Sequence, residues 1–311
     1  MPTISTLAQQ TLMLRSLDQL QGKAIELQGQ ISSGLVSQDI SGLGLAAGRV
    51  ANLQGSIQHH QAFLDTIATV QQRIQESTDV LSNVQSSVQK FQQLLPNGAY
   101  DTTPSDIQTQ AKQLLGVLGD LLNTQDGSRY LFSGSLTGTA PFVAASLPVP
   151  GDLTTLVNGA PPSGYYAGNA AISTARVDDN LTINYGITAD DPAIEKVIRT
   201  LNFLANLPPG SPSSSNATDV SNINQAAVLM GQGLQGLQNV LGTLALQSAA
   251  MKQVQQNHQD FVNLATSNIG SVESIDPAKA ITELNQVETN LQASYATISG
   301  LQQLSLVNYL K

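Results

Sequence analysis

The chain contains no cysteine and no tryptophan, and charged residues make up only 11% of its 311 positions. Without cysteine it can have no disulfide framework and no thiolate chemistry. Aromatic residues reach only 4%, which is little for a pocket that binds a small organic ligand. Its polarity comes mainly from Gln, Asn, Ser and Thr, which repel copies of the same chain only weakly. These shortages favour a protein that packs against other chains over one that performs chemistry.

The few charges are mostly negative, with 13 basic residues against 22 acidic ones. This balance disfavours nucleic acid or an anionic membrane surface as a partner. No apolar run approaches the ~20 residues that a membrane-spanning helix needs. The first fifteen residues lack a basic leader followed by an apolar block, so we expect no cleaved Sec-type signal peptide. Residence in the cytosol and export by another route both stay open.

Residues that could support catalysis or metal binding are sparse. The only histidines are His59, His60 and His258, and the last two fall on helical seams, which favours a packing role. A helical metal site needs two histidines three or four residues apart and an acidic partner. The acidic pairs at 178–179 and 190–191 suit turn and N-cap positions better than a calcium loop. We therefore predict no catalytic residue, no cofactor and no metal ligand.

The C-terminal segment has the pattern of a coiled-coil helix. Asp276 suits an N-cap and Pro277 the first helical position. Apolar positions then alternate in steps of 3 and 4, which predicts a seam of Leu284, Val287, Leu291, Ser294, Ile298 and Leu301. Beyond it the apolar residues point to several sides of the helix, namely Leu304, Leu306, Val307, Tyr309 and Leu310. A helix that is apolar all round must be buried on every side, so we expect copies of the chain to cover it.

The N-terminal segment has a similar pattern. Its seam again steps by 4 and 3, through Met13, Leu17, Leu20, Ala24, Leu27 and Ile31. The simplest arrangement pairs the two terminal helices, parallel or antiparallel. The predicted assembly interface therefore combines residues of both helices: Leu7, Leu14, Leu17, Leu20, Leu27, Ile298, Leu301, Leu304, Leu306, Val307, Tyr309 and Leu310.

Between the two ends the sequence predicts long helices around a β-rich insert. Helical periodicity covers about 43–95, 104–122 and 192–204, and the longest seam runs from 220 to 272. Asp126 and Gly127 form a stop after the second of these helices. Within the insert, YLFSGSLTGTAPFV reads as a strand, a turn and a second extended piece, and ARVDDNLTINYGI as a hairpin. Gly231, Gly233 and Gly236 lie inside the longest seam, where close approach of another helix would explain them.

The expected fold class is mainly α with a small β insert. Both termini would contribute to a long antiparallel helical rod or coiled-coil bundle, with the β-rich domain in the middle. We expect residues 1–35 and 276–311 to form the assembly core, 36–129 and 192–275 the long-helix bundle, and 130–191 the inserted domain.

Four stretches resemble the bacterial flagellin superfamily. ISSGLVSQDISGLGLA, from Ile31, is similar to the family's first helix–turn–helix, although Asp39–Leu43 stands where Asp-Asp-Pro-Ala-Gly is common. Leu291–Tyr295 and Leu304–Leu310 match its closing helix. The stretch Tyr130–Gly134, followed by Pro141 and Phe142, resembles the hook–filament junction branch of the superfamily.

The resemblance implies a structural protein that joins hook to filament outside the cell. It implies export through the flagellar type III apparatus without a cleaved signal peptide. Its partners would be other copies of itself, a neighbouring hook-associated protein and flagellin, and a cytoplasmic export chaperone at the C-terminal helix. A filament flagellin of the same superfamily is the alternative. An enzyme with its site in the β insert is a third hypothesis, which the lack of a catalytic constellation disfavours.

Overall fold

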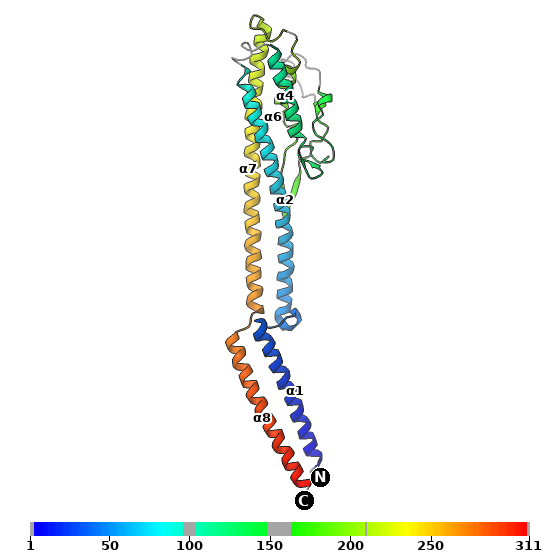
Figure 1. The fold of residues 1–311 in the computed structure, drawn as a ribbon, viewed down its shortest axis with the longest axis vertical. Coiled ribbons are helices and arrows are strands. Elements are labelled where there is room, and N and C mark those ends of the chain that lie inside the picture. The colour runs from blue at the N-terminus through cyan, green and yellow to red at the C-terminus, as the bar shows by residue number, and fades with distance from the viewer. Residues whose placement is uncertain (1–2, 96–103, 148–162, 209, 310–311) are drawn as a thin grey trace. The chain divides into compact units, whose positions relative to one another are not determined.

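The computed structural model describes residues 3–95, 104–147, 163–208 and 210–309. The chain divides into two compact units, one of Met1–His60 with Asp260–Lys311 and one of Gln61–Gln259. Long helices come from both termini, and two small antiparallel sheets lie in the middle of the sequence (Figure 1). The expectation of a mainly helical chain with a small β insert is confirmed. The domain limits given above stay a prediction.

The first unit is built on α1 (Thr3–Ser33) and α8 (Pro277–Tyr309), which pack side by side. They run antiparallel: Leu35, just after α1, bridges Ser274, just before α8, while Gln21 reaches Tyr295 further along α8. Figure 1 accordingly shows the two chain ends together at one end of this helix pair. Asp276 caps α8 as expected, because its Oδ1 accepts the amides of Ala278 and Lys279 at 3.0 and 3.2 Å.

The connection after α1 departs from the sequence prediction. Gly34 ends α1 with a φ of 73°, a conformation that glycine adopts without a steric penalty. A 3₁₀ segment η1 (Ile40–Ala46) then precedes α2 (Ala47–Gln92). The predicted start at Leu43 is therefore wrong, because Gly44, with φ 58° and ψ −124°, interrupts the helical backbone.

The second unit is organised around four helices. They are α4 (Pro104–Leu122), α6 (Pro192–Ala205) and the larger parts of α2 and of α7 (Ala217–Glu273). Six apolar positions of the predicted α7 seam are buried within this unit: Ile223, Met230, Leu234, Leu237, Leu244 and Met251. A Cβ on Gly233 or Gly236 would lie 2.7 Å from Val197 Cγ2 or 2.6 Å from Ala193 Cβ. These two glycines thus permit the close approach of α6 to α7.

The β structure is smaller than the sequence suggested. Strands β3 (Thr174–Asp178) and β4 (Leu181–Asn184) form the predicted antiparallel hairpin. Helix α4 ends at Leu122, before the stop predicted at Asp126 and Gly127. These two residues instead belong to a hairpin of β1 (Gln125–Asp126) and β2 (Arg129–Tyr130). The strand expected from Tyr130 onward is wrong, because the backbone leaves the sheet after β2 and binds other segments instead.

Aromatic residues attach the insert to the helices. Phe132, Phe142 and Tyr165 are buried in the same hydrophobic cluster as the inner faces of α2, α4, α6 and α7. Gly119 on α4 makes room for this contact, since a Cβ there would lie 2.6 Å from the ring of Phe142. The described part of the insert therefore depends on the helices for its core.

Asp191 begins α6 and gives a prediction that can be tested by pH. Its Oδ1 accepts the amide of Ala193 at 2.8 Å. Burial, and to a lesser degree nearby Asp190, raise the pKa of Asp191, although the Ala193 bond lowers it. A raised folded-state pKa means that the ionised carboxylate lowers stability above that pKa, and that this penalty disappears as pH falls through it.

We expect Asp191→Asn to retain the cap without the charge and to melt at least as high as the parent chain at pH 7. The difference in melting temperature between Asp191→Asn and the parent chain should disappear at acidic pH. Asp191→Ala loses both the charge and the cap, and should be about 1 kcal/mol less stable than Asp191→Asn at every pH. Thermal unfolding of the three proteins across pH measures this. An asparagine variant that melts below the alanine variant would contradict the assignment.

Candidate assembly interface

The inner surface of the α1–α8 pair is the predicted seam. Leu17, Leu27 and Ala280 are buried, at 8%, 2% and 6% exposure. The remaining described seam positions are half-buried, namely Met13, Leu20, Ala24, Ile31, Leu284, Val287, Leu291, Ser294 and Ile298. Almost every other described position of the two helices is exposed. The pair is therefore a two-helix coiled coil with a narrow apolar seam.

Five large apolar side chains in the described part of the pair lie outside this seam, and four of them gather on one flank. The fifth, Leu12, is 66% exposed and lies on the other flank of α1. Leu14 and Ile25 on α1 are 55% and 70% exposed, and Ile281 and Tyr295 on α8 are 47% and 50% exposed. Residues 14 and 25 are about three helical turns apart, so they share one flank of α1. Gln21 lies between them on that flank and donates to Tyr295 Oη at 2.6 Å, which places Tyr295 on the same side of the pair.

These four residues, Leu14, Ile25, Ile281 and Tyr295, are called the apolar flank below. Helical spacing puts Ile281 on the side of α8 that Tyr295 occupies, about four turns before it. Two carboxylates, Asp18 and Glu288, lie among them. A two-helix pair cannot cover such residues, so they are available to another chain.

The structure distributes the predicted interface residues over two surfaces. Leu17, Leu20, Leu27 and Ile298 lie in the seam, where α1 and α8 cover one another, whereas Leu14 lies on the apolar flank. Helix α8 continues through Leu301, Leu304, Leu306, Val307 and Tyr309, but these side chains lie outside the described residues, as do those of Leu7 and Leu310. Sequence reasoning missed Ile25, Ile281 and Tyr295, although the 11-residue spacing from Leu14 could have identified the first.

The histidines of the seams have the packing role that their positions predicted. His60 stacks on Phe261 with ring centroids 4.0 Å apart, and His258 on Phe63 at 5.2 Å. His258 is only 2% exposed, and its Nε2 lies 2.8 Å from the carbonyl oxygen of Val177 in β3. The three histidines have no metal-binding cluster around them in the part of the chain that the structure describes.

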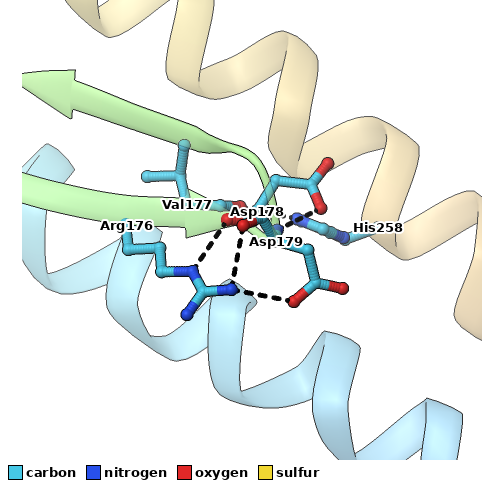
Figure 2. A network of polar contacts seen from close by, with 5 residues as sticks. All are labelled: Arg176, Val177, Asp178, Asp179 and His258. Carbon is cyan, nitrogen blue, oxygen red and sulfur yellow. Dashed lines mark hydrogen bonds and ion pairs between the residues drawn. The ribbon is translucent and has the colours of Figure 1, made fainter.

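Figure 2 shows how this contact fixes the end of the β3–β4 hairpin against α7. Arg176 closes the adjacent turn, donating from Nη2 to the Asp179 carbonyl at 2.8 Å and to its Oδ1 at 3.2 Å. The same arginine donates from Nε to the Asp178 carbonyl at 3.3 Å. The acidic pair at 178–179 therefore forms a turn, as the sequence predicted.

The junction-like stretch Tyr130–Gly134 is held by Asn169. Its Oδ1 accepts the Ser135 amide at 2.8 Å, its Nδ2 donates to Ser135 Oγ at 2.6 Å, and its own amide donates to the Ser133 carbonyl at 3.1 Å. Gly134 has a φ of 69°, and a Cβ there would lie 2.1 Å from the Asn169 carbonyl oxygen. Only glycine fits this turn, which explains its place in the motif.

Comparisons with known proteins agree with this architecture. Residues 4–137 match the family described as the bacterial flagellin N-terminal helical region. No curated protein matches the sequence. Among the described helices, none is both long enough and apolar enough to cross a bilayer.

Three solved structures have a similar fold at low sequence identity. A putative flagellar hook-associated protein from Vibrio parahaemolyticus is 15% identical, with a TM-score of 0.58 over 76% of this chain and 99% of its own. FlgL from Bacillus cereus is 17% identical, with a TM-score of 0.54 over 71% and 100% of the two chains. The flagellar junction protein FlgL from Legionella pneumophila is 14% identical, with a TM-score of 0.51 over 72% and 99%.

Proposed function

We propose that this chain, whose residues 4–137 carry the bacterial flagellin N-terminal helical region, is a structural junction between the hook and the filament of a flagellum. One observation carries the proposal. The two termini form a coiled-coil pair with a row of apolar residues on one outer flank, in a fold shared with proteins named for the hook-associated position.

The helix pair suits a subunit that polymerises. The apolar flank is a separate surface from the seam. It can contact an unlike surface on a neighbouring subunit, and head-to-tail contacts of this kind generate rings or helical tubes. The flank residues need no rearrangement of the seam to make this contact, because the seam is already closed within one chain. Assembly can therefore add contacts without breaking those that fold the monomer.

The proposed partners follow from that role. Other copies of the chain, a neighbouring hook-associated protein and flagellin would cover the apolar flank and the last turns of α8. An export chaperone would bind α8 in the cytoplasm, and the chain would leave through the flagellar type III apparatus without a cleaved signal peptide. We assign no enzymatic activity and no cofactor to it.

A filament flagellin of the same superfamily remains the second candidate, because the match to residues 4–137 is a match to flagellin itself. A strain that lacks the chain distinguishes the two. A junction protein predicts complete hooks without filaments and flagellin monomers shed into the medium. A minor filament flagellin predicts attached filaments and little free flagellin, and that result would overturn the proposal.

A single charge on the apolar flank should separate folding from assembly. Ile25 is 70% exposed, so Ile25→Glu should change the stability of the monomer by no more than about 0.5 kcal/mol. In the flagellum it would bury an unpaired carboxylate, and we expect the exported variant to fail to enter. Motility, with export checked by immunoblot of the medium, measures this.

The matched control is Gln19→Glu, which adds the same charge to an exposed position on another side of α1. It should leave motility unchanged. Normal motility of the Ile25 variant would show that the apolar flank is not an assembly contact.

A further inference from the structure

The second unit contains a polar cleft. Its enclosed volume is about 30 Å³, enough for one or two water-sized groups, and the cleft opens to solvent. Its walls come from three separate parts of the chain: α2, the β1–β2 hairpin with the turn that follows it, and the segments that flank the β3–β4 hairpin. Nothing in the proposed junction role requires such a cleft.

The charges around the cleft are opposite in sign to those of the chain. Two arginines, Arg73 and Arg129, and one carboxylate, Asp126, line it, which gives a local charge of +1 in a chain of net charge −9. These are the only charged residues of its lining. A monoanion is therefore attracted, whereas Asp126 opposes a dianion such as phosphate.

Hydrogen bonds hold the Arg73 guanidinium in place but do not use all of its donors. Its Nε donates to Asp126 Oδ2 at 2.8 Å and its Nη1 to Tyr185 Oη at 3.3 Å. These two hydrogen bonds, with Asp126 the stronger cause, raise the pKa of Arg73, so the guanidinium stays charged at any physiological pH. A guanidinium has five N–H donors, and in the described part of the chain only two have acceptors.

Arg129 supplies the second cation. It is exposed at the cleft edge, opposite Asp126 in the β1–β2 hairpin, and has no ion-pair partner among the described residues. The remaining lining mixes hydroxyl groups with the aliphatic side chains of Leu131, Ile172 and Ile187. Planar guanidinium groups match the geometry of a carboxylate, and the aliphatic wall suits a short methylene stem.

We propose that this cleft binds a carboxylate on a short aliphatic stem. The group is either a small free carboxylic acid or the side chain of a glutamate or aspartate on a neighbouring subunit. Either source would use the same two arginines, with Asp126 and Tyr185 holding Arg73 in position. Carboxylate binding itself does not depend on the junction role, whereas a neighbouring subunit as the source rests on it.

Side-chain Nε–Hε resonances of the full-length chain test the binding directly. We expect sodium acetate and N-acetylglutamate α-amide to shift the Arg73 and Arg129 signals in a saturable manner, while sodium chloride at equal ionic strength does not. Arg129→Gln should weaken the affinity at least tenfold. Arg176→Gln, which removes an exposed arginine at the β3–β4 turn, should leave it unchanged.

The proposal would be overturned if sodium chloride shifted the two arginine resonances as much as acetate does. It would also be overturned if Arg129→Gln bound acetate with unchanged affinity. Motility of that variant then identifies the source of the carboxylate. Once acetate binding is established, an Arg129→Gln chain that is exported but does not enter the flagellum indicates a neighbouring subunit. Normal entry indicates a free carboxylic acid.

Discussion

Replacing Leu237 by aspartate is expected to unfold the second unit at a temperature about 10 °C below that of the parent chain. Leu237 is 0% exposed on α7, inside the cluster formed with α2, α4 and α6. Among the described residues no lysine or arginine is buried. The variant would bury an unpaired carboxylate and should lose roughly 4 kcal/mol of folding free energy.

Gln238→Asp is the matched control, because it places the same charge on the next, exposed residue of α7. Its stability should stay within about 0.5 kcal/mol of the parent. Circular dichroism during thermal unfolding measures both variants. Equal melting temperatures for the two would mean that the α7 seam is not buried in the monomer.

Removal of residues 301–311 should have the opposite profile, with little effect on folding and a complete effect on assembly. The described part of the α1–α8 pair is held by a seam that extends from Met13 to Ile31 and from Ala280 to Ile298. That seam remains after truncation at Gly300. Melting temperature should therefore change by only a few degrees.

The removed segment contains apolar residues around the whole helix. Burying four or five of them between subunits at about 1.5–3 kcal/mol each would offset the ordering entropy of one short helix. We expect the truncated chain to be exported and yet absent from the flagellum, with weaker binding to the proposed export chaperone. Full-length chain with Gln302 and Gln303 changed to alanine is the control. A truncated chain that still joins filament to hook would refute an assembly role for this segment.

The helical framework could be predicted because its signals are local and periodic. Alternating steps of 3 and 4 identified the α1, α7 and α8 seams, and Asp276 with Pro277 fixed the start of α8. The start of α2 was missed because Gly44 breaks the backbone without disturbing the apolar pattern. The spacing of apolar side chains indicates which positions are buried, but it does not indicate the backbone angles φ and ψ.

The cleft and the apolar flank could not be predicted in the same way. Arg73 and Asp126 are 53 residues apart, and no periodicity connects a helix to a distant β-hairpin. The segment that begins at Tyr130 was predicted to be a strand because its residues favour extended backbone. In the structure Asn169 holds it in a turn through hydrogen bonds. On α1 only Leu14 shares the flank of Ile25, and the apolar flank becomes a surface because Tyr295 reaches the same side from α8.

The position of the chain along the flagellum tests the central claim most directly. Immunogold labelling of the native chain on intact flagella, viewed by electron microscopy, measures that position. A structural junction predicts a single narrow band of label where the hook meets the filament. Label distributed along the length of the filament would contradict the claim and make the chain a filament subunit.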